Sequence, residues 1–164
     1  MILDIKTYPN KILTKKTKPV GEIDAVVKKL IDDMVETLYA SKGAGLAANQ
    51  VGETKQIVVV DEGSGLLVLI NPKITKKKGA VISAEGCLSF PGLEVEAKRP
   101  VKIEVEYKDR HGQHKKMKAE QLLARIICHE TDHLRGKTIL DKLPLFERLK
   151  IKRQLKKGKK VATA

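Results

Sequence analysis

Apolar positions between residues 24 and 41 repeat with the period of an α-helix. They fall three and four residues apart, at Val27, Leu30, Ile31, Met34, Val35 and Leu38. Asp24 stands just before this pattern, where an aspartate can accept hydrogen bonds from the free N–H groups of a first helical turn. The pattern therefore predicts an amphipathic helix over residues 24–41.

Apolar runs after this helix predict strands. Residues 56–61 and 66–70 are almost continuously apolar, which is typical of buried strands. Residues 101–107 alternate apolar and charged side chains, the pattern of a half-exposed strand. A turn over residues 109–112 and a strand over 114–117 complete a hairpin.

Two intervening segments lack these patterns. Residues 81–93 are interrupted by glycine and proline, and we expect irregular backbone there. Lys76, Lys77 and Lys78 read as a short charged turn.

A second helix is expected over residues 119–135, with Gly136 at its C-terminal cap. Its expected buried stripe contains Leu122, Ile126, His129 and His133. Pro144 begins a last helix that runs into a basic tail. The predicted fold class is α+β, with antiparallel or mixed β-sheets packed around the second helix and further helices near the two ends.

The composition fits one globular domain. The chain has 164 residues, 41% of them hydrophobic, and no tryptophan. This is enough to bury a core without disulfide bonds. We expect one catalytic domain over residues 1–147 and a basic tail over residues 148–164. No segment approaches the roughly 20 apolar residues of a membrane span, and no signal peptide is evident, so we expect a cytoplasmic protein without a membrane partner.

The net charge of +13 suggests an acidic partner. Much of the excess lies after Glu147, where no acidic residue occurs and eight basic residues follow: Arg148, Lys150, Lys152, Arg153, Lys156, Lys157, Lys159 and Lys160. A basic nucleic-acid-binding protein therefore remains an alternative to an enzyme, and it would bind no stoichiometric metal.

The run from His129 to His133 carries the main candidate chemistry. Histidines four residues apart share one face of a helix, where they can bind one cation, and Glu130 lies beside them as a general base. Two histidines satisfied within a core are the alternative interpretation. A buried glutamate, however, needs a partner such as a cation, which favours a metal-dependent hydrolase.

A catalytic metal usually has a third protein ligand. Ile139 occupies the position of a downstream third histidine, and the carboxylates after His133 lie too close to it. His111 and His114 read as solvated hairpin residues, and Cys128 points about 100° away from His129 around the helix. Cys87 is the best remaining ligand, although an ordinary buried thiol stays open. A metallopeptidase would instead use a histidine or carboxylate at this place.

The loop of small residues over 43–48 superficially matches a dinucleotide fingerprint. That fingerprint follows a strand and opens a helix, whereas this loop follows a helix and leads into a strand. Its glycines would instead let backbone approach a ligand, and Gln50 adds an amide donor. A plain turn is the alternative.

Three segments together resemble the signature motifs of peptide deformylase, in the same order. They are Gly43-Ala44-Gly45-Leu46-Ala47-Ala48-Asn49-Gln50, Glu85-Gly86-Cys87-Leu88-Ser89 and His129-Glu130-Thr131-Asp132-His133. The similarity in organisation covers roughly residues 1 to 145. It implies removal of the formyl group from N-formylmethionine at the start of nascent polypeptides.

The resemblance also implies roles for single residues. Cys87, His129 and His133 would hold one divalent metal, usually Fe²⁺, with Zn²⁺ or Ni²⁺ as alternatives. Glu130 would be the general base and acid. Gln50 and the Leu88 backbone N–H would bind the formyl oxygen, and Gly45 would contact the substrate backbone. Because such enzymes act on chains leaving the ribosome, we expect the basic tail to dock on ribosomal RNA.

Overall fold

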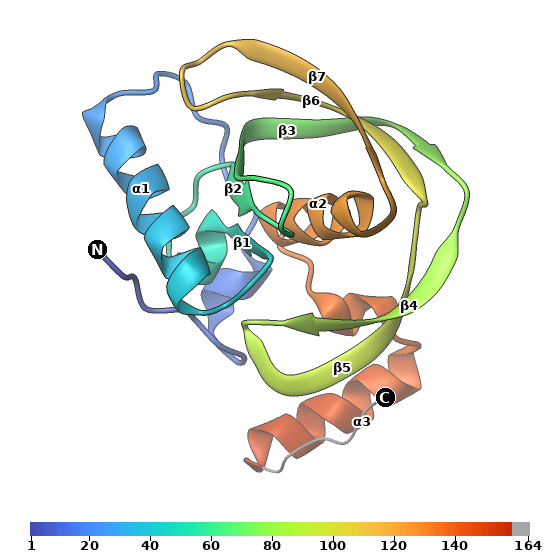
Figure 1. Cartoon of the computed structure of the whole chain (residues 1–164). Helices are drawn as coiled ribbons and strands as arrows, with labels where there is room; N and C mark the ends of the chain where they lie inside the picture. Colours follow the sequence, from blue (N-terminus) through green and yellow to red (C-terminus); the bar gives the residue numbers. More distant parts are fainter. Residues whose placement is uncertain (159–164) are drawn as a thin grey trace.

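The computed structural model of the chain describes residues 1–158, which form one α+β arrangement (Figure 1). The helices are α1 (Ala25–Ala40), α2 (Gln121–Leu134) and α3 (Leu145–Lys156), with short 3-10 helices η1 (Lys11–Thr14), η2 (Ala48–Val51) and η3 (Ile139–Lys142). The strands are β1 (Gly45–Ala47), β2 (Ile57–Val60), β3 (Leu67–Lys78), β4 (Val81–Cys87), β5 (Phe90–Arg99), β6 (Lys102–Lys108) and β7 (His114–Glu120).

The strands form two antiparallel sheets around α2. One sheet has the order β1-β2-β3-β6-β7, and the other is the β4-β5 pair. Helix α2 lies between the two sheets, and α1 covers the opposite face of the larger sheet (Figure 1). The predicted fold class is confirmed.

Strand β2 shows how the sheet separates two cores. All four of its side chains are buried, and successive side chains of a strand point to opposite faces. Ile57 and Val59 join the α1 core, whereas Val58 and Val60 join the α2 core. A strand covered on both faces needs a continuous apolar run, which is the pattern seen in the sequence.

The first two helices agree with the sequence to within two residues. Asp24 caps α1, since its Oδ1 accepts a hydrogen bond of 2.8 Å from the Val27 N–H. Helix α2 begins at Gln121 and not at residue 119, because Ala119 and Glu120 still pair with β6. Gly136 ends the helix as expected, with a φ of 74° and a hydrogen bond of 2.9 Å from its N–H to the His133 carbonyl.

Two expectations about the middle of the chain are wrong. The three lysines at 76–78 are not a turn but the end of β3, where pairing with β6 outweighs their low strand propensity. The segment 81–93 is not irregular, because β4 and the start of β5 form a hairpin there. The alternating burial of Leu93, Val95 and Ala97 is the strand signal that the neighbouring glycine and proline obscured.

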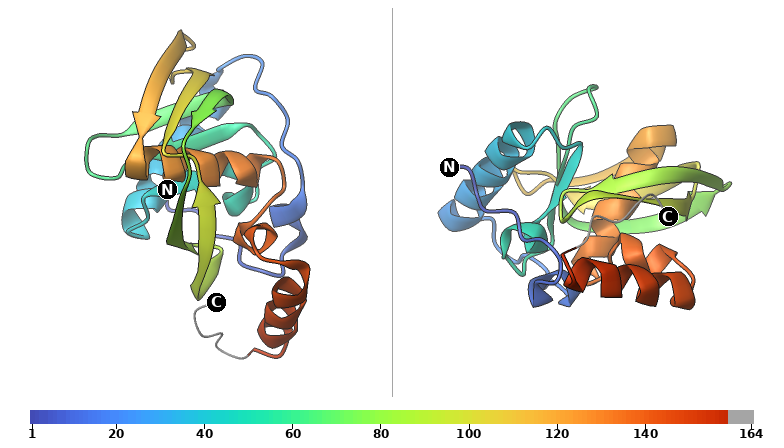
Figure 2. Two further views of the ribbon diagram at one scale, coloured as in Figure 1. Left: turned by 90° about the vertical axis from the view of Figure 1, so that its right-hand side faces the viewer. Right: turned by 90° about the horizontal axis from the view of Figure 1, so that it is seen from below.

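Helix α3 follows Pro144, as expected, and packs on the outside of the β4-β5 pair (Figure 2). Ile151 is buried in a cluster with Phe90, Leu93 and Leu140. The helix therefore crosses the boundary expected after Glu147, and the separate role of residues 148–164 stays a prediction. Residues 159–164 of that tail, with Lys159 and Lys160, lie outside the described part. No helix within residues 1–158 is long and apolar enough to cross a membrane.

Candidate metal centre

Three side chains converge where β4 meets α2. The Cys87 Sγ atom lies 3.2 Å from His133 Nε2, which lies 3.2 Å from His129 Nε2. All three potential ligand atoms are within 4.8 Å of one another. A thiolate and two imidazole nitrogens suit a divalent transition metal, and three of them directed at one point leave a coordination position for water or substrate. The donor set therefore fits a catalytic metal.

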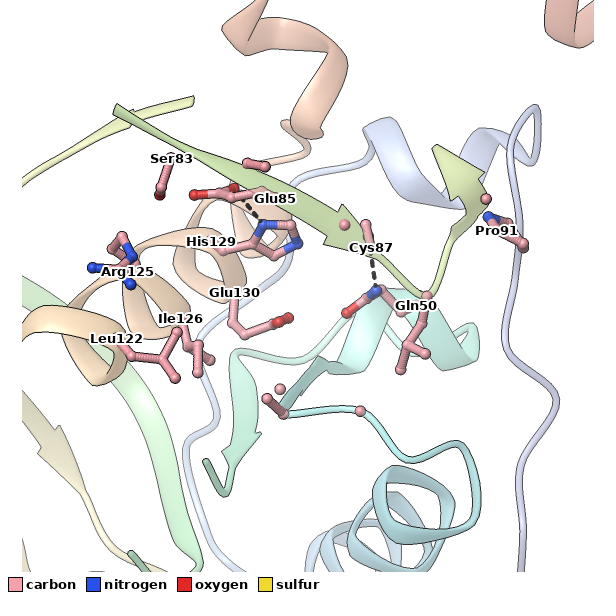
Figure 3. Close-up of a pocket in the computed structure, with 17 residues that line it drawn as sticks. Gln50, Ser83, Glu85, Cys87, Pro91, Leu122, Arg125, Ile126, His129 and Glu130 are labelled. Atoms are coloured by element: carbon pink, nitrogen blue, oxygen red, sulfur yellow. Dashed lines mark hydrogen bonds and ion pairs between the residues drawn. The ribbon is translucent and has the colours of Figure 1, made fainter. Parts of the chain in front are cut away.

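A buried ion-pair network orients one of these ligands. Glu85 Oε2 accepts a hydrogen bond of 3.0 Å from His129 Nδ1 (Figure 3). Glu85 also pairs with Arg99 at 2.7 and 2.9 Å. Arg99 in turn donates to Asp132 at 2.6 Å. With Nδ1–H held by a carboxylate, the Nε2 lone pair of His129 is free to bind a metal.

Glu85 is ionised in this network. Burial alone would raise its pKa, but the hydrogen bonds from His129 and Arg99 lower the pKa to about 2. No role for Glu85, Arg99 or Asp132 was predicted from the sequence. The signal that could have found Glu85 is its position two residues before Cys87, which places both on one face of β4.

Glu130 is the buried carboxylate of the site. Its side chain lines the cleft beside His129, and its Oε2 has no hydrogen-bond partner among the described residues (Figure 3). Burial raises the pKa of Glu130 to about 7. A carboxylate with this pKa can both accept and donate a proton near neutral pH, which is what a general acid–base group requires.

Gln50 presents its amide N–H₂ group to the centre. Its Oε1 accepts a hydrogen bond of 2.8 Å from the Ala47 N–H, so the orientation of the amide is fixed. Its Nε2 lies 3.2 Å from Ser89 Oγ and 3.5 Å from Cys87 Sγ. Gln50 is therefore placed as a hydrogen-bond donor beside the proposed metal ligands.

These groups line one cleft of about 580 Å³. Its walls are the 43–45 loop, β4 with the following turn, and one face of α2 (Figure 3). Gly45 and Leu88 both line it, so the cleft contains six of the seven expected site residues; the seventh, His133, lies buried beneath the other ligands. Leu122 does not belong to a buried stripe: it is 48% exposed, because it borders this opening.

The other candidate ligands lie elsewhere. His111 and His114 are exposed at the β6-β7 hairpin. Cys128 is buried in the α2 core, where burial raises the pKa of its thiol. These positions agree with the expectation that His111 and His114 are solvated hairpin residues and that Cys128 points away from the metal ligands.

The backbone at Gly45 passes so close to Glu130 that no side chain fits between them. A Cβ atom at residue 45 would lie 2.5 Å from Glu130 Oε1 and 2.8 Å from its Cγ. We expect Gly45→Ala to displace Glu130. The kcat of a hydrolysis that uses Glu130 as its acid–base group should then fall roughly 100-fold, because displacements of about 1 Å have effects of this size. Gly21→Ala is the matched control, since nothing lies within 4 Å of a Cβ there. Equal kcat values for the two variants would contradict the close approach.

Comparison with known proteins gives one consistent family. The model of the polypeptide deformylase family matches residues 2–149. The peptide deformylase of Thermoanaerobacter pseudethanolicus is 45% identical over 152 residues, which cover 93% of this chain and 96% of that protein. The peptide deformylase of Caldanaerobacter subterraneus subsp. tengcongensis is 49% identical over 142 residues, covering 87% of this chain and 89% of that protein.

Solved structures agree. The peptide deformylase from Ehrlichia chaffeensis in complex with actinonin superposes with a TM-score of 0.91 at 39% identity, covering 98% of this chain and 99% of that one. The structure from Legionella pneumophila gives 0.90 at 36% identity, with coverages of 96% and 95%.

Proposed function

The chain belongs to the polypeptide deformylase family and is a formyl-removing hydrolase, and we propose that its Cys87-His129-His133 centre and Glu130 perform that reaction. The substrate is N-formylmethionine at the start of nascent polypeptides. The observation that carries this proposal is the convergence of a thiol and two imidazoles beside a buried carboxylate in an open cleft. Since the proposed substrate is a polypeptide that is being made on the ribosome, we propose that the enzyme acts in the cytoplasm.

One divalent metal ion would be held by Cys87, His129 and His133. When bound, it supplies the positive charge that makes water a sufficient nucleophile at neutral pH. We propose Fe²⁺, because the resemblance to peptide deformylases implies it. Zn²⁺ and Ni²⁺ are the alternatives, since two imidazoles and a thiolate accommodate all three metals. Metal analysis of anaerobically purified protein distinguishes them.

Glu130 moves the proton in the proposed reaction. It accepts a proton from the attacking water, whose oxygen forms a bond to the formyl carbon. Gln50 Nε2 and the Leu88 N–H donate hydrogen bonds to the formyl oxygen as negative charge develops on it. Glu130 then returns the proton to the departing nitrogen, the C–N bond breaks, and the products are formate and a peptide with a free amine.

The peptide would lie extended along β4. This strand pairs with β5 on one side only, and its other edge faces the cleft opposite Gly45. A free strand edge can hydrogen-bond an extended chain. Gly45 would contact the substrate backbone there, since its lack of a side chain lets its backbone lie directly against Glu130 at the wall of the cleft.

Hydrolysis of formyl-Met-Ala-Ser by anaerobically purified protein tests the function. We expect stoichiometric formate and Met-Ala-Ser, and no cleavage of the internal bonds. Acetyl-Met-Ala-Ser is the control substrate, and internal cleavage would favour a metallopeptidase. If the folded, metal-loaded protein leaves the formyl peptide intact, the proposal is wrong.

We also propose that the basic face of α3 contacts ribosomal RNA. Lys150, Arg153, Lys156 and Lys157 are exposed, whereas Ile151 holds the helix on the core. Contacts between lysine or arginine and phosphate dominate such binding and weaken steeply with salt.

Deleting residues 148–164 would remove Ile151 as well as the charges, so substitution is the sharper test. A quadruple variant replaces Lys150, Arg153, Lys156 and Lys157 with glutamine. We expect it to weaken co-sedimentation with ribosomes at low salt by at least tenfold. The salt dependence should also become shallower, by about one unit of slope for each phosphate that the variant no longer binds.

The matched control removes the same charge from exposed lysines elsewhere, at Lys11, Lys15, Lys16 and Lys28. It should co-sediment like the unmodified chain. Equal binding by the two quadruple variants would mean that the net charge of the protein, and not the basic face of α3, governs the association.

A further inference from the structure

The residues with which strand β4 and helix α2 face each other across the cleft are spaced at similar intervals. Alternate residues of β4 recur about every 6.6 Å, and residues four apart on α2 recur about every 6 Å. Cys87 therefore meets His133 at 3.2 Å, and two residues earlier Glu85 meets His129 at 3.0 Å. The same spacing sets Ser83 of β4 opposite Arg125 of α2, and both residues line the cleft.

Ser83 and Arg125 carry hydrogen-bond donors that no described residue uses. The Ser83 Oγ atom is buried without a partner, and Arg125 forms no hydrogen bond or ion pair within residues 1–158. Both line the cleft, on the side away from Gln50 and Pro91 (Figure 3). Two donors that the protein leaves unused in a substrate cleft point to an acceptor oxygen on the ligand.

The position of this pair matches the end of the first side chain of the substrate. The formyl group must lie at Gln50 and Glu130, and Arg125 and Ile126 are one helical turn from His129 and Glu130. That distance of about 6 Å is comparable with the reach of a methionine side chain. Leu122 and Ile126 offer an apolar wall for its methylene groups, which leaves its sulfur near Ser83 and Arg125.

We propose that Ser83 and Arg125 form a polar end of the first-residue pocket that accepts peptides beginning with N-formylmethionine sulfoxide. This inference rests on the proposed deformylase function. A thioether sulfur is a weak acceptor, whereas oxidation of methionine adds a strongly polar oxygen. Ser83 Oγ–H and the Arg125 guanidinium would donate to that oxygen. The sulfoxide itself takes no part in the reaction and leaves unchanged.

The test compares formyl-Met-Ala-Ser with its methionine sulfoxide form, each sulfoxide epimer separately. An apolar pocket rejects a substrate that adds a polar group by about 100-fold in kcat/KM, so we expect the unmodified enzyme to lose less than tenfold. In Ser83→Ala and Arg125→Met, the ratio of sulfoxide to methionine kcat/KM should fall at least tenfold further. The loss should appear in KM, because the contact exists equally in ground and transition states.

Ser64→Ala and Arg135→Met make the same chemical changes at exposed positions away from the cleft and should keep the original ratio. The inference is overturned if the ratio is unchanged in either cleft variant, if the controls shift it equally, or if the unmodified enzyme rejects the sulfoxide tenfold or more. Failure of the folded, metal-loaded enzyme on formyl-Met-Ala-Ser itself would overturn the proposed function, and this inference with it.

Discussion

Replacing Glu130 with glutamine is expected to lower kcat for formyl-Met-Ala-Ser by about 10³-fold, within the range that general acid–base catalysis contributes. Glutamine has nearly the same shape, so the cleft and its metal ligands should keep their geometry. It cannot accept a proton from water, however, nor deliver one to the departing amine. Single-turnover measurement of formate release, with metal content determined on the same samples, checks this expectation.

The pH dependence of thermal stability provides a second comparison of the unmodified protein with the Glu130→Gln variant. In the metal-free protein, burial raises the pKa of Glu130 from 4.5 to about 7. A raised carboxyl pKa favours folding while the group is protonated, and that contribution is lost as pH rises from 4.5 through about 7. The metal-free Glu130→Gln variant lacks this loss. Its unfolding temperature should therefore exceed that of the unmodified protein by more at pH 8 than at pH 5.

Glu130→Asp separates the presence of a carboxylate from its position. It keeps a carboxylate but withdraws it by one methylene from its position beside Gly45, so its activity should fall between those of the unmodified and glutamine forms. A glutamine variant that is folded, metal-loaded and as active as the unmodified enzyme would exclude Glu130 as the proton carrier.

The local parts of this site could be predicted from the sequence because helical spacing is a local property. His129, Glu130 and His133 lie within five consecutive residues, and the period of a helix alone places the two histidines on one face. The capping of α1 by Asp24 and the helix end at Gly136 are local in the same sense. Each depends on the backbone within a few residues.

The parts that escaped prediction depend on distant pairing. Glu85 meets His129 across 44 residues of sequence, and Arg99 joins β5 to α2 through Asp132. No periodicity in one segment reports such a contact. The prediction of a turn at the end of β3 was wrong for the same reason. The lysines there have low strand propensity, and only the pairing of Lys76 with Glu104 and Lys77 with Ile103 in β6 makes them a strand.

Cys87 stands between these two cases. Its residue type and Gly-flanked position suggested a ligand, but only the hairpin of β4 and β5 brings its sulfur to His133. The burial of the site also could not be read locally. Leu122 follows the helical period of buried residues and yet borders the open cleft, because that face of α2 meets the cleft instead of a packed sheet.

The metal requirement gives the second large effect, through Cys87→Ala. Cys87 supplies the only thiolate among the three converging ligands, and its removal leaves two imidazoles from one helix. We expect metal affinity to fall by more than the 10–100-fold typical of changes to groups that merely orient a ligand. Deformylation should fall to background as metal dissociates in dilute chelator, and metal analysis after gel filtration measures the occupancy.

Cys128→Ala is the matched control, since it removes the same thiol from the neighbouring α2 core. It should lower stability through poorer packing and leave metal stoichiometry unchanged. The two variants should therefore have opposite effects. Cys87→Ala should keep the fold and lose the metal, whereas Cys128→Ala should keep the metal in a less stable fold. If Cys87→Ala retains one metal per chain at unchanged affinity, a different residue must complete the site. A histidine or carboxylate ligand, as in a metallopeptidase, would then have to be sought outside the convergence of β4 and α2.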